Sequence, residues 1–408
     1  MSWRSGALVA MATLAWAYPA YAEEDPVEAR LSELESWVKS VDWIDDFGLG
    51  GRIETDYNLY GGAYNADAGG EPASELFGRR VRIMIETEHG DFDQKTIVEL
   101  LDEGSEILLA RVRWYAPDGH VVKIGKIRED ISLQALTSSK RLAIMERSTL
   151  ADMFSPYFRW GIGVYRYLDE LGLRYALGVY KNDAQGAAGK DDFGLNTLAV
   201  SGRINGSWAF DDARFHVGAW YSWRDFGGST LAPRMARGEV RRTTIRLVDY
   251  AAGGAQVELD ELNEAGFELV WQQGPVMVQA EAAARRLGAE DSSAALDGAI
   301  FSSMYLEASW FPGGQVRSYS TSRGVFDKPN EKDGIFELAA RVGFTDGSAE
   351  GQGTEVLTGI FGANYHFDKH IKLMTAIAYS NVGGAGREAL VGRYGEGLGL
   401  GVRFQYML

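Results

Sequence analysis

Arginine and lysine side chains recur in this sequence at spacings that would let several of them act on one small anion. Arg80 and Arg82 are separated by one residue, as are Arg111 and Arg113, and five arginines lie within residues 234–246. A guanidinium group presents paired N–H donors that match the oxygens of phosphate. Several such sites in a row, each of them weak, would bind a small oxyanion and let it move on.

A two-residue alternation of apolar and polar side chains indicates the strands that would carry these cations. In residues 80–87, Val81, Ile83 and Ile85 fall on one face, and residues 108–115 repeat the pattern. Successive side chains of a β-strand point to opposite sides, so the cations share the face opposite the apolar residues. That face would hold Arg80, Arg82, Arg111, Arg113 and Lys123, whereas the adjacent Arg79 is predicted to point to the lipid side or the rim.

Roughly sixteen segments of this kind follow one another along the chain. We place them at residues 47–60, 77–89, 92–102, 106–116, 120–127, 158–168, 171–181, 195–209, 213–225, 264–273, 275–287, 299–311, 335–345, 355–367, 370–382 and 397–408. The connections on one side are short, and the other side carries most of the long loops. The connection 312–334 breaks this rule, because it is long but falls on the short side. Short inner turns and long outer loops are typical of bacterial outer-membrane barrels.

The composition excludes several other classes of protein. The chain has no cysteine, 41 Lys+Arg, 57 Asp+Glu and a net charge of −16. A disulfide scaffold, a Cys-ligated metal and a Cys nucleophile are therefore excluded, and the acidic balance argues against a nucleic-acid partner. A soluble exported β protein and a transmembrane β-barrel remain.

The first 46 residues read as two segments that precede the barrel. Residues 1–22 have the basic start, apolar stretch and Ala-Tyr-Ala end of a cleaved secretory signal. Residues 23–46 place valines and leucines at three- and four-residue steps, which predicts an amphipathic helix or short coiled coil in the periplasm. Two heptads form no stable coil alone, so this segment would need oligomerisation or docking on its own protein.

Residues 47–408 are thus predicted to form an all-β, 16-stranded antiparallel transmembrane β-barrel. A cylinder of that width cannot be filled by the side chains of its own strands and holds an aqueous lumen. The charged face would line the water and the apolar face would meet lipid, in the outer membrane of a Gram-negative bacterium.

Two stretches give the sequence a more specific resemblance. Residues 125–147 read GKIREDISLQALTSSKRLAIMER, and residues 305–341 contain YLEASWFPGG and FELAAR. These stretches resemble the phosphate-selective porin family of the porin O/P type, whose signature joins a strand end to Leu-Thr-Ser-Ser-Lys and Met-Glu-Arg. Arg128 stands where the family usually has Lys, and Asp130 stands where Pro is common, which adds a negative charge near the constriction.

The resemblance implies a homotrimer of channels, each narrowed by two outer loops and one inner connection folded into the lumen. The corresponding segments here are 128–157, 226–263 and 312–334, and all three carry clustered cations. They are Arg128, Lys140, Arg141 and Arg147 in the first, Arg234, Arg237, Arg241, Arg242 and Arg246 in the second, and Arg317, Arg323, Lys328 and Lys332 in the third.

We therefore expect passive diffusion of small anions, phosphate among them, with no catalysis and no cofactor. The expected roles are Arg80, Arg82, Arg111, Arg113 and Lys123 as wall charges, Arg128, Lys140 and Arg141 at the constriction, and Arg234, Arg237, Arg241 and Arg242 in an outer funnel. Alternatively, the wall cations pair with acids such as Glu86, Glu88, Glu99 and Glu337, and the 234–246 arginines bind lipopolysaccharide phosphates. A weakly selective or cation-preferring porin and a non-conducting structural barrel are the competing functions.

Metal binding and hydrolysis have little support in the sequence. His366, Asp368 and His370 have a spacing compatible with a metal, but a tight turn such as YHFDKH is more often a solvated hairpin. No grouping of serine, histidine and acid can be assembled from the five histidines.

Overall fold

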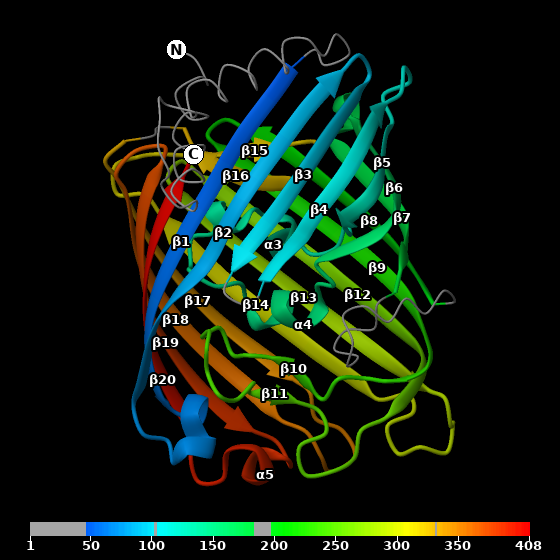
Figure 1. The fold of residues 1–408 in the computed structure, drawn as a ribbon, viewed down its shortest axis with the longest axis vertical. Helices are drawn as coiled ribbons and strands as arrows, with labels where there is room; N and C mark the ends of the chain where they lie inside the picture. The colour runs from blue at the N-terminus through cyan, green and yellow to red at the C-terminus, as the bar shows by residue number, and fades with distance from the viewer. Residues whose placement is uncertain (1–45, 102–103, 183–196, 331–332) are drawn as a thin grey trace, which may run out of the picture.

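The computed structural model describes residues 46–101, 104–182, 197–330 and 333–408, and in these residues sixteen antiparallel strands close into one barrel (Figure 1). Each strand pairs with its neighbour along the barrel, and β1 pairs with β20 to close it. The strands are β1 (Asp46–Gly62), β2 (Ala73–His89), β3 (Phe92–Leu101), β4 (Gly104–Tyr115), β5 (Val121–Arg128), β6 (Phe158–Leu168), β7 (Leu173–Lys181), β8 (Leu198–Phe210), β9 (Ala213–Thr230), β12 (Glu258–Gln273), β13 (Val276–Ala289), β14 (Ile300–Trp310), β17 (Ile335–Asp346), β18 (Glu355–His366), β19 (Ile371–Gly383) and β20 (Glu396–Met407). The predicted barrel is confirmed, whereas the predicted signal and N-terminal helix lie outside the described residues.

The side-chain alternation places apolar residues outside and charged residues inside. Phe267 and Leu398 are 69% and 61% exposed on the outer surface, whereas Arg174 and Arg403 are buried in the interior. An apolar outer band and an ionic interior are the arrangement expected of a barrel in lipid. No helix in the described part of the chain is long and apolar enough to cross a membrane.

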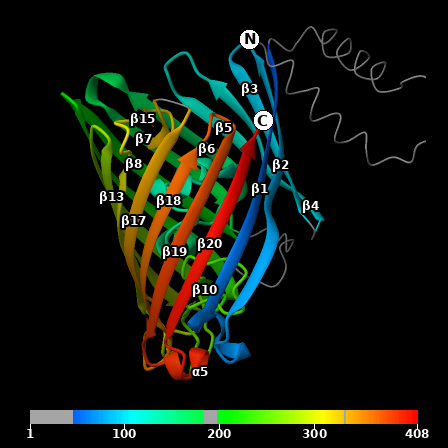
Figure 2. The ribbon, with the colours of Figure 1, turned by 90° about the vertical axis from the view of Figure 1, so that its left-hand side faces the viewer.

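The connections differ in length at the two ends of the barrel, as the sequence predicted. Six connections of two to five residues, such as 90–91 after β2 and 211–212 after β8, lie at the end where the C-terminus is found (Figures 1 and 2). One of them contains the short helix η3 (Asp169–Leu171). The opposite end carries the connections with η1 (Ala63–Ala68) and α5 (Arg387–Val391).

Three long connections fold into the barrel. The first contains α3 (Leu133–Leu136), η2 (Ser139–Arg141) and α4 (Thr149–Phe154), the second contains β10 (Arg234–Ala236) and β11 (Val248–Asp249), and the third contains β15 (Arg317–Ser320) and β16 (Val325–Pro329). We call residues 129–157 the first loop, 231–257 the second loop and 311–334 the inner hairpin. Inward side chains of the wall hold each of them in place. Asn364 donates to the carbonyl of Ala143, Asn58 to that of Arg241 and Gln272 to that of Arg317, at 2.6, 3.0 and 3.0 Å.

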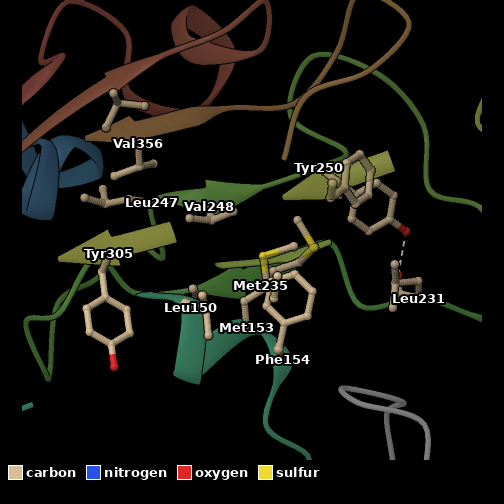
Figure 3. Close-up of a cluster of buried hydrophobic side chains, with 14 of the residues drawn as sticks. Leu150, Met153, Phe154, Leu231, Met235, Leu247, Val248, Tyr250, Tyr305 and Val356 are labelled. Carbon is tan, nitrogen blue, oxygen red and sulfur yellow. Dashed lines mark hydrogen bonds between the residues drawn. The ribbon is translucent and has the colours of Figure 1, made fainter. Parts of the chain in front are cut away.

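The first and second loops build an apolar core inside the barrel (Figure 3). Leu150, Met153 and Phe154 from α4 pack with Met235 and Val248 from the two short strands. The hydroxyl of Tyr250 donates to the carbonyl of Leu231 at 2.6 Å and fixes the second loop on itself. The sequence predicted infolded loops and an aqueous, ionic lumen, but it did not predict an apolar core within that lumen.

Candidate constriction site

Arg80 and Arg82 both point into the barrel from β2, and each pairs with a glutamate of a neighbouring strand. Arg80 contacts Glu54 of β1. Arg82 forms a bidentate pair with Glu99 of β3, with both N–O distances at 2.9 Å. Glu54 also lies 3.3 Å from Nη1 of Arg52 and 4.0 Å from Nε of Arg403, so one carboxylate serves three guanidinium groups. These predicted wall charges lie in the interior and are partly compensated there.

Arg79 also reaches the interior, so the prediction that it faces lipid or the rim is wrong. The register between β1 and β2 shifts after Glu54, which pairs with Arg80, and Arg79 is the extra residue of a β-bulge. Its guanidinium donates to the two carboxylate oxygens of Glu146 in the first loop, at 3.1 and 3.3 Å. The bulge interrupts the alternation, and two successive arginines therefore face inward.

Arg111 and Arg113 share the carboxylate of Asp93 on β3. Nε of Arg113 donates to both carboxylate oxygens at 2.9 Å, and Nη2 of Arg111 lies 4.0 Å from Oδ1. The hydroxyl of Tyr115 donates to the same carboxylate at 2.6 Å. Two cations again compete for one acid.

Lys123 is buried in the wall with Asp130 as its partner. Nη2 of Arg174 donates to the other oxygen of Asp130 at 2.7 Å. Burial alone would raise the pKa of Asp130, but Arg174 and Lys123 outweigh burial and hold that pKa below its usual range. Asp130 is 4% exposed between two cations. The negative charge that Asp130 adds at this place is therefore compensated by two cations.

The end of β5 and the first loop carry cations that have no acidic partner. Among the residues that the structure describes, Arg128, Lys140 and Arg147 make no ion pair. Arg128 donates to the carbonyl of Ala135 and lies over the ring of Phe158. Arg147 donates to the carbonyls of Gln134 and Thr137, at 3.1 and 2.7 Å. Carbonyl oxygens satisfy the donors but leave the positive charge uncancelled.

Lys140 and Arg141 lie where the first loop meets the inner hairpin. Nε of Arg141 is 3.0 Å from Oδ1 of Asp327, which also pairs with Arg323. Nη1 of Arg317 donates to the carbonyl of Arg141 at 2.9 Å, so the two segments form one unit. In that cluster the carboxylate of Asp327 faces two guanidinium groups.

Within residues 234–246 of the second loop, five arginines are accompanied by a single acid, Glu239. Acids from elsewhere in the fold lie close to four of them. Arg234 lies 4.0 Å from Asp249, Arg237 3.6 Å from Asp152, Arg241 2.8 Å from Glu146 and Arg242 3.7 Å from Glu75. Glu239 instead binds the buried Arg341 of β17. Arg234 and Arg242 are the exposed members of the predicted funnel, whereas Arg241 is tied to the first loop.

The alternative in which wall cations pair with nearby acids holds for some of the four glutamates named for it, Glu86, Glu88, Glu99 and Glu337. Glu99 pairs with Arg82 as that alternative expects, while Glu86 pairs with Lys95 and Glu337 with Arg317. Sequence reasoning also missed Arg52, Arg341 and Arg403, which line the interior. The alternation of inward and outward side chains along β1, β17 and β20 could have identified these arginines. It does not identify the acids with which they pair.

The burial of Lys140 supplies a test that depends on pH. Burial, together with the neighbouring Arg141 and Arg52, lowers the pKa of Lys140 to about 8. The ammonium is therefore charged below pH 8 and loses its proton above it, and the attraction for anions should weaken between pH 7 and pH 9. We expect the preference for chloride over potassium, measured as a reversal potential, to fall over this range. In Lys140→Arg, whose guanidinium keeps its proton, the fall should be clearly smaller than in the wild type.

Comparisons with known proteins agree with this architecture. The family model described as "Phosphate-selective porin O and P" matches residues 47–408. Porin O of Pseudomonas aeruginosa is 25% identical over 336 residues, which cover 74% of this chain and 73% of that protein.

Solved structures share the fold at low sequence identity. An anion-selective porin from Comamonas acidovorans is 12% identical, with a TM-score of 0.53, and the match covers 89% of this chain and 99% of the other. OmpT, an outer membrane protein of Vibrio cholerae, in its trimer form is 10% identical, with a TM-score of 0.54 and the same coverage. These likenesses extend over nearly the whole barrel.

Proposed function

The chain belongs to the phosphate-selective porin O and P family, and on that premise we propose that it carries small anions, phosphate among them, by passive diffusion. Its family and fold are those of channels in the outer membrane of Gram-negative bacteria. The proposal adds the sign of the selectivity and the class of ion. It also includes a homotrimeric assembly, the absence of catalysis and cofactors, and contact of the exposed Arg234 and Arg242 with lipopolysaccharide.

The observation that carries the anion preference is the group of uncompensated cations at the end of β5 and in the first loop. Arg128, Lys140 and Arg147 have no ion pair within the described residues, and all three lie inside the barrel, where Arg147 lines a recess with Arg237 and Arg241. An ion responds most to charges within a Debye length, about 8 Å at physiological salt. The net charge of −16 for the whole chain is therefore a poor guide to selectivity.

Three clusters of wall charges support the same sign, although Arg341 alone serves both Glu239 and Glu307. Asp93 and Asp130 each serve two cations and Glu54 serves three, so the cations outnumber the carboxylate in each of these clusters. Mixed pairing alone would favour neither ion. A cation-preferring pore would need acids that outnumber the basic groups, and these clusters have the opposite ratio.

Phosphate is favoured over chloride by the chemistry of the donors. Most of the cations are arginines, whose N–H groups match two oxygens of one phosphate, whereas a spherical ion gains no such geometry. Partial compensation by acids keeps each site weak enough to release the ion.

Current through the purified protein in a planar bilayer tests this proposal. We expect conductance steps, and we expect millimolar phosphate to reduce the chloride current more than an equal concentration of a monovalent anion such as acetate does. Equal effects of the two anions would contradict phosphate preference. The absence of any steps would favour the non-conducting barrel, for which the apolar core within the lumen is the supporting feature.

A further inference from the structure

Three guanidinium groups from separate parts of the fold converge on the carboxylate of Glu146 in the first loop. Arg79 of β2 donates to both oxygens at 3.1 and 3.3 Å, and Nε of Arg241 in the second loop donates to Oε2 at 2.8 Å. Arg403 of β20 donates to Oε1. This arrangement has the donors of an oxyanion site, and a side chain of the protein occupies it.

Glu146 is the ion-pair partner on which two of these arginines depend. In the described ranges of the chain, neither Arg79 nor Arg241 has another carboxylate within ion-pair distance. Arg403 differs, because Asp56 also binds it with two contacts of 2.7 Å. Without the charge on Glu146, Arg79 and Arg241 would be open to an anion from the lumen.

Empty space adjoins this carboxylate on two sides. One recess is lined by Arg147, Arg237 and Arg241 together with Asp152 and Glu239. A second recess lies against Asp56, Asn58 and Arg241. Each recess has room for about one water molecule rather than for a hydrated anion. The side chains of Arg241 and Arg79 are 24% and 14% exposed, so an anion in the lumen meets them at the surface beside Glu146.

We propose that Glu146 acts as an internal anion that competes with the permeating anion for Arg79 and Arg241, and so sets how tightly the channel holds phosphate. This inference rests on the proposed anion-channel function and assigns a specificity-determining role to one residue. A permeating phosphate gains these guanidinium groups only in part, because the carboxylate shares them.

Competition of this kind explains why a negative residue sits in a cation-rich constriction. A channel conducts only if its sites attract an ion enough to admit it and release it quickly enough to let it leave. Two uncontested arginines beside Arg147 would form a tight site for a multivalent anion. The carboxylate weakens that site while keeping the arginines in position.

The variant Glu146→Gln removes the charge at nearly constant size. We expect the phosphate concentration that halves the chloride current to fall about tenfold, the size expected when an anion gains an uncontested charge-assisted hydrogen bond. The control is Glu268→Gln, which removes another buried carboxylate, one that pairs with Arg203 elsewhere on the wall. In the control, the half-blocking concentration should stay within about twofold, because no anion path is assigned there.

Unchanged or weaker phosphate block in a folded Glu146→Gln channel would overturn this inference, since a purely positioning role predicts loss of binding. If the Glu146→Gln channel does not assemble, phosphate block of the Glu146→Asp channel is the test instead. The shorter acid cannot reach Arg79 and Arg241 together, so block should again tighten, and equal block would overturn the inference.

If phosphate does not block the wild-type channel, the proposed function itself fails. If phosphate blocks the wild type and neither variant changes that block, only the inference fails.

Discussion

Replacing Arg341 with methionine should detach the infolded loops from the wall and raise the single-channel conductance severalfold, with loss of ion selectivity. Arg341 is fully buried on β17 and donates to Glu307 at 2.6 and 2.9 Å. It also binds Glu239 of the second loop and the carbonyl of Glu146 in the first, the latter at 3.1 Å. A single guanidinium therefore joins both loops to the barrel.

The size of this effect follows from the charges that would remain. Methionine leaves Glu239 and Glu307 buried without their cation, and breaking a buried ion pair on one side costs about 3–5 kcal/mol. The barrel strands form their own hydrogen-bond ladders, so we expect the loss to fall on loop docking rather than on insertion of the barrel. An exposed arginine serves as the control. Arg393→Met, at the outer rim, removes a contact to Tyr394 alone and should conduct as the wild type does. Wild-type conductance in Arg341→Met would show that other contacts hold the loops.

Reversing the charge at Lys140 should lower the anion-to-cation permeability ratio roughly tenfold or more at low salt. A unit charge about 8 Å from an ion in a water-like medium changes the energy of that ion by about 0.5 kcal/mol. Replacing lysine with glutamate changes the charge by two units. The anion-to-cation permeability ratio falls for two reasons, because the anion is disfavoured and the cation is favoured.

Lys140 is suited to this test because it has no ion pair in the described chain and sits among like charges. The cations that act on it most strongly are Arg141, Arg52 and Lys95. The control is Lys369→Glu, in the turn between β18 and β19, which makes the same change of charge away from the infolded loops. Reversal potentials in a gradient of KCl give the ratio for both variants. A ratio shifted equally in both would mean that Lys140 has no special place on the ion path.

Much of the barrel could be predicted from the sequence, because strand alternation is a local property. The boundaries expected for the segment at 158–168 match β6, and those expected for 355–367 differ from β18 by one residue. A bulge changes the alternation without any change of composition, which explains the error at Arg79. The register that creates the bulge depends on β1, a partner that the local pattern does not identify.

The candidate site was predicted in outline only. The resemblance named the three infolded segments, and the residue types indicated anion chemistry. Ion pairs such as Arg241 with Glu146 join residues 95 positions apart in sequence, and no spacing rule predicts them. Asp130 illustrates the same limit, since Arg174 of β7, 44 positions along the chain, shares its carboxylate with the nearby Lys123.

The central claim is that the infolded loops make the narrow part of the channel more favourable to anions than to cations. Its most direct test is the reversal potential of the wild-type channel in a planar bilayer that separates two concentrations of KCl at pH 7. The account predicts a sign that corresponds to chloride crossing more readily than potassium. A potential of the opposite sign would mean that the acids of the lumen govern permeation, and it would contradict the account.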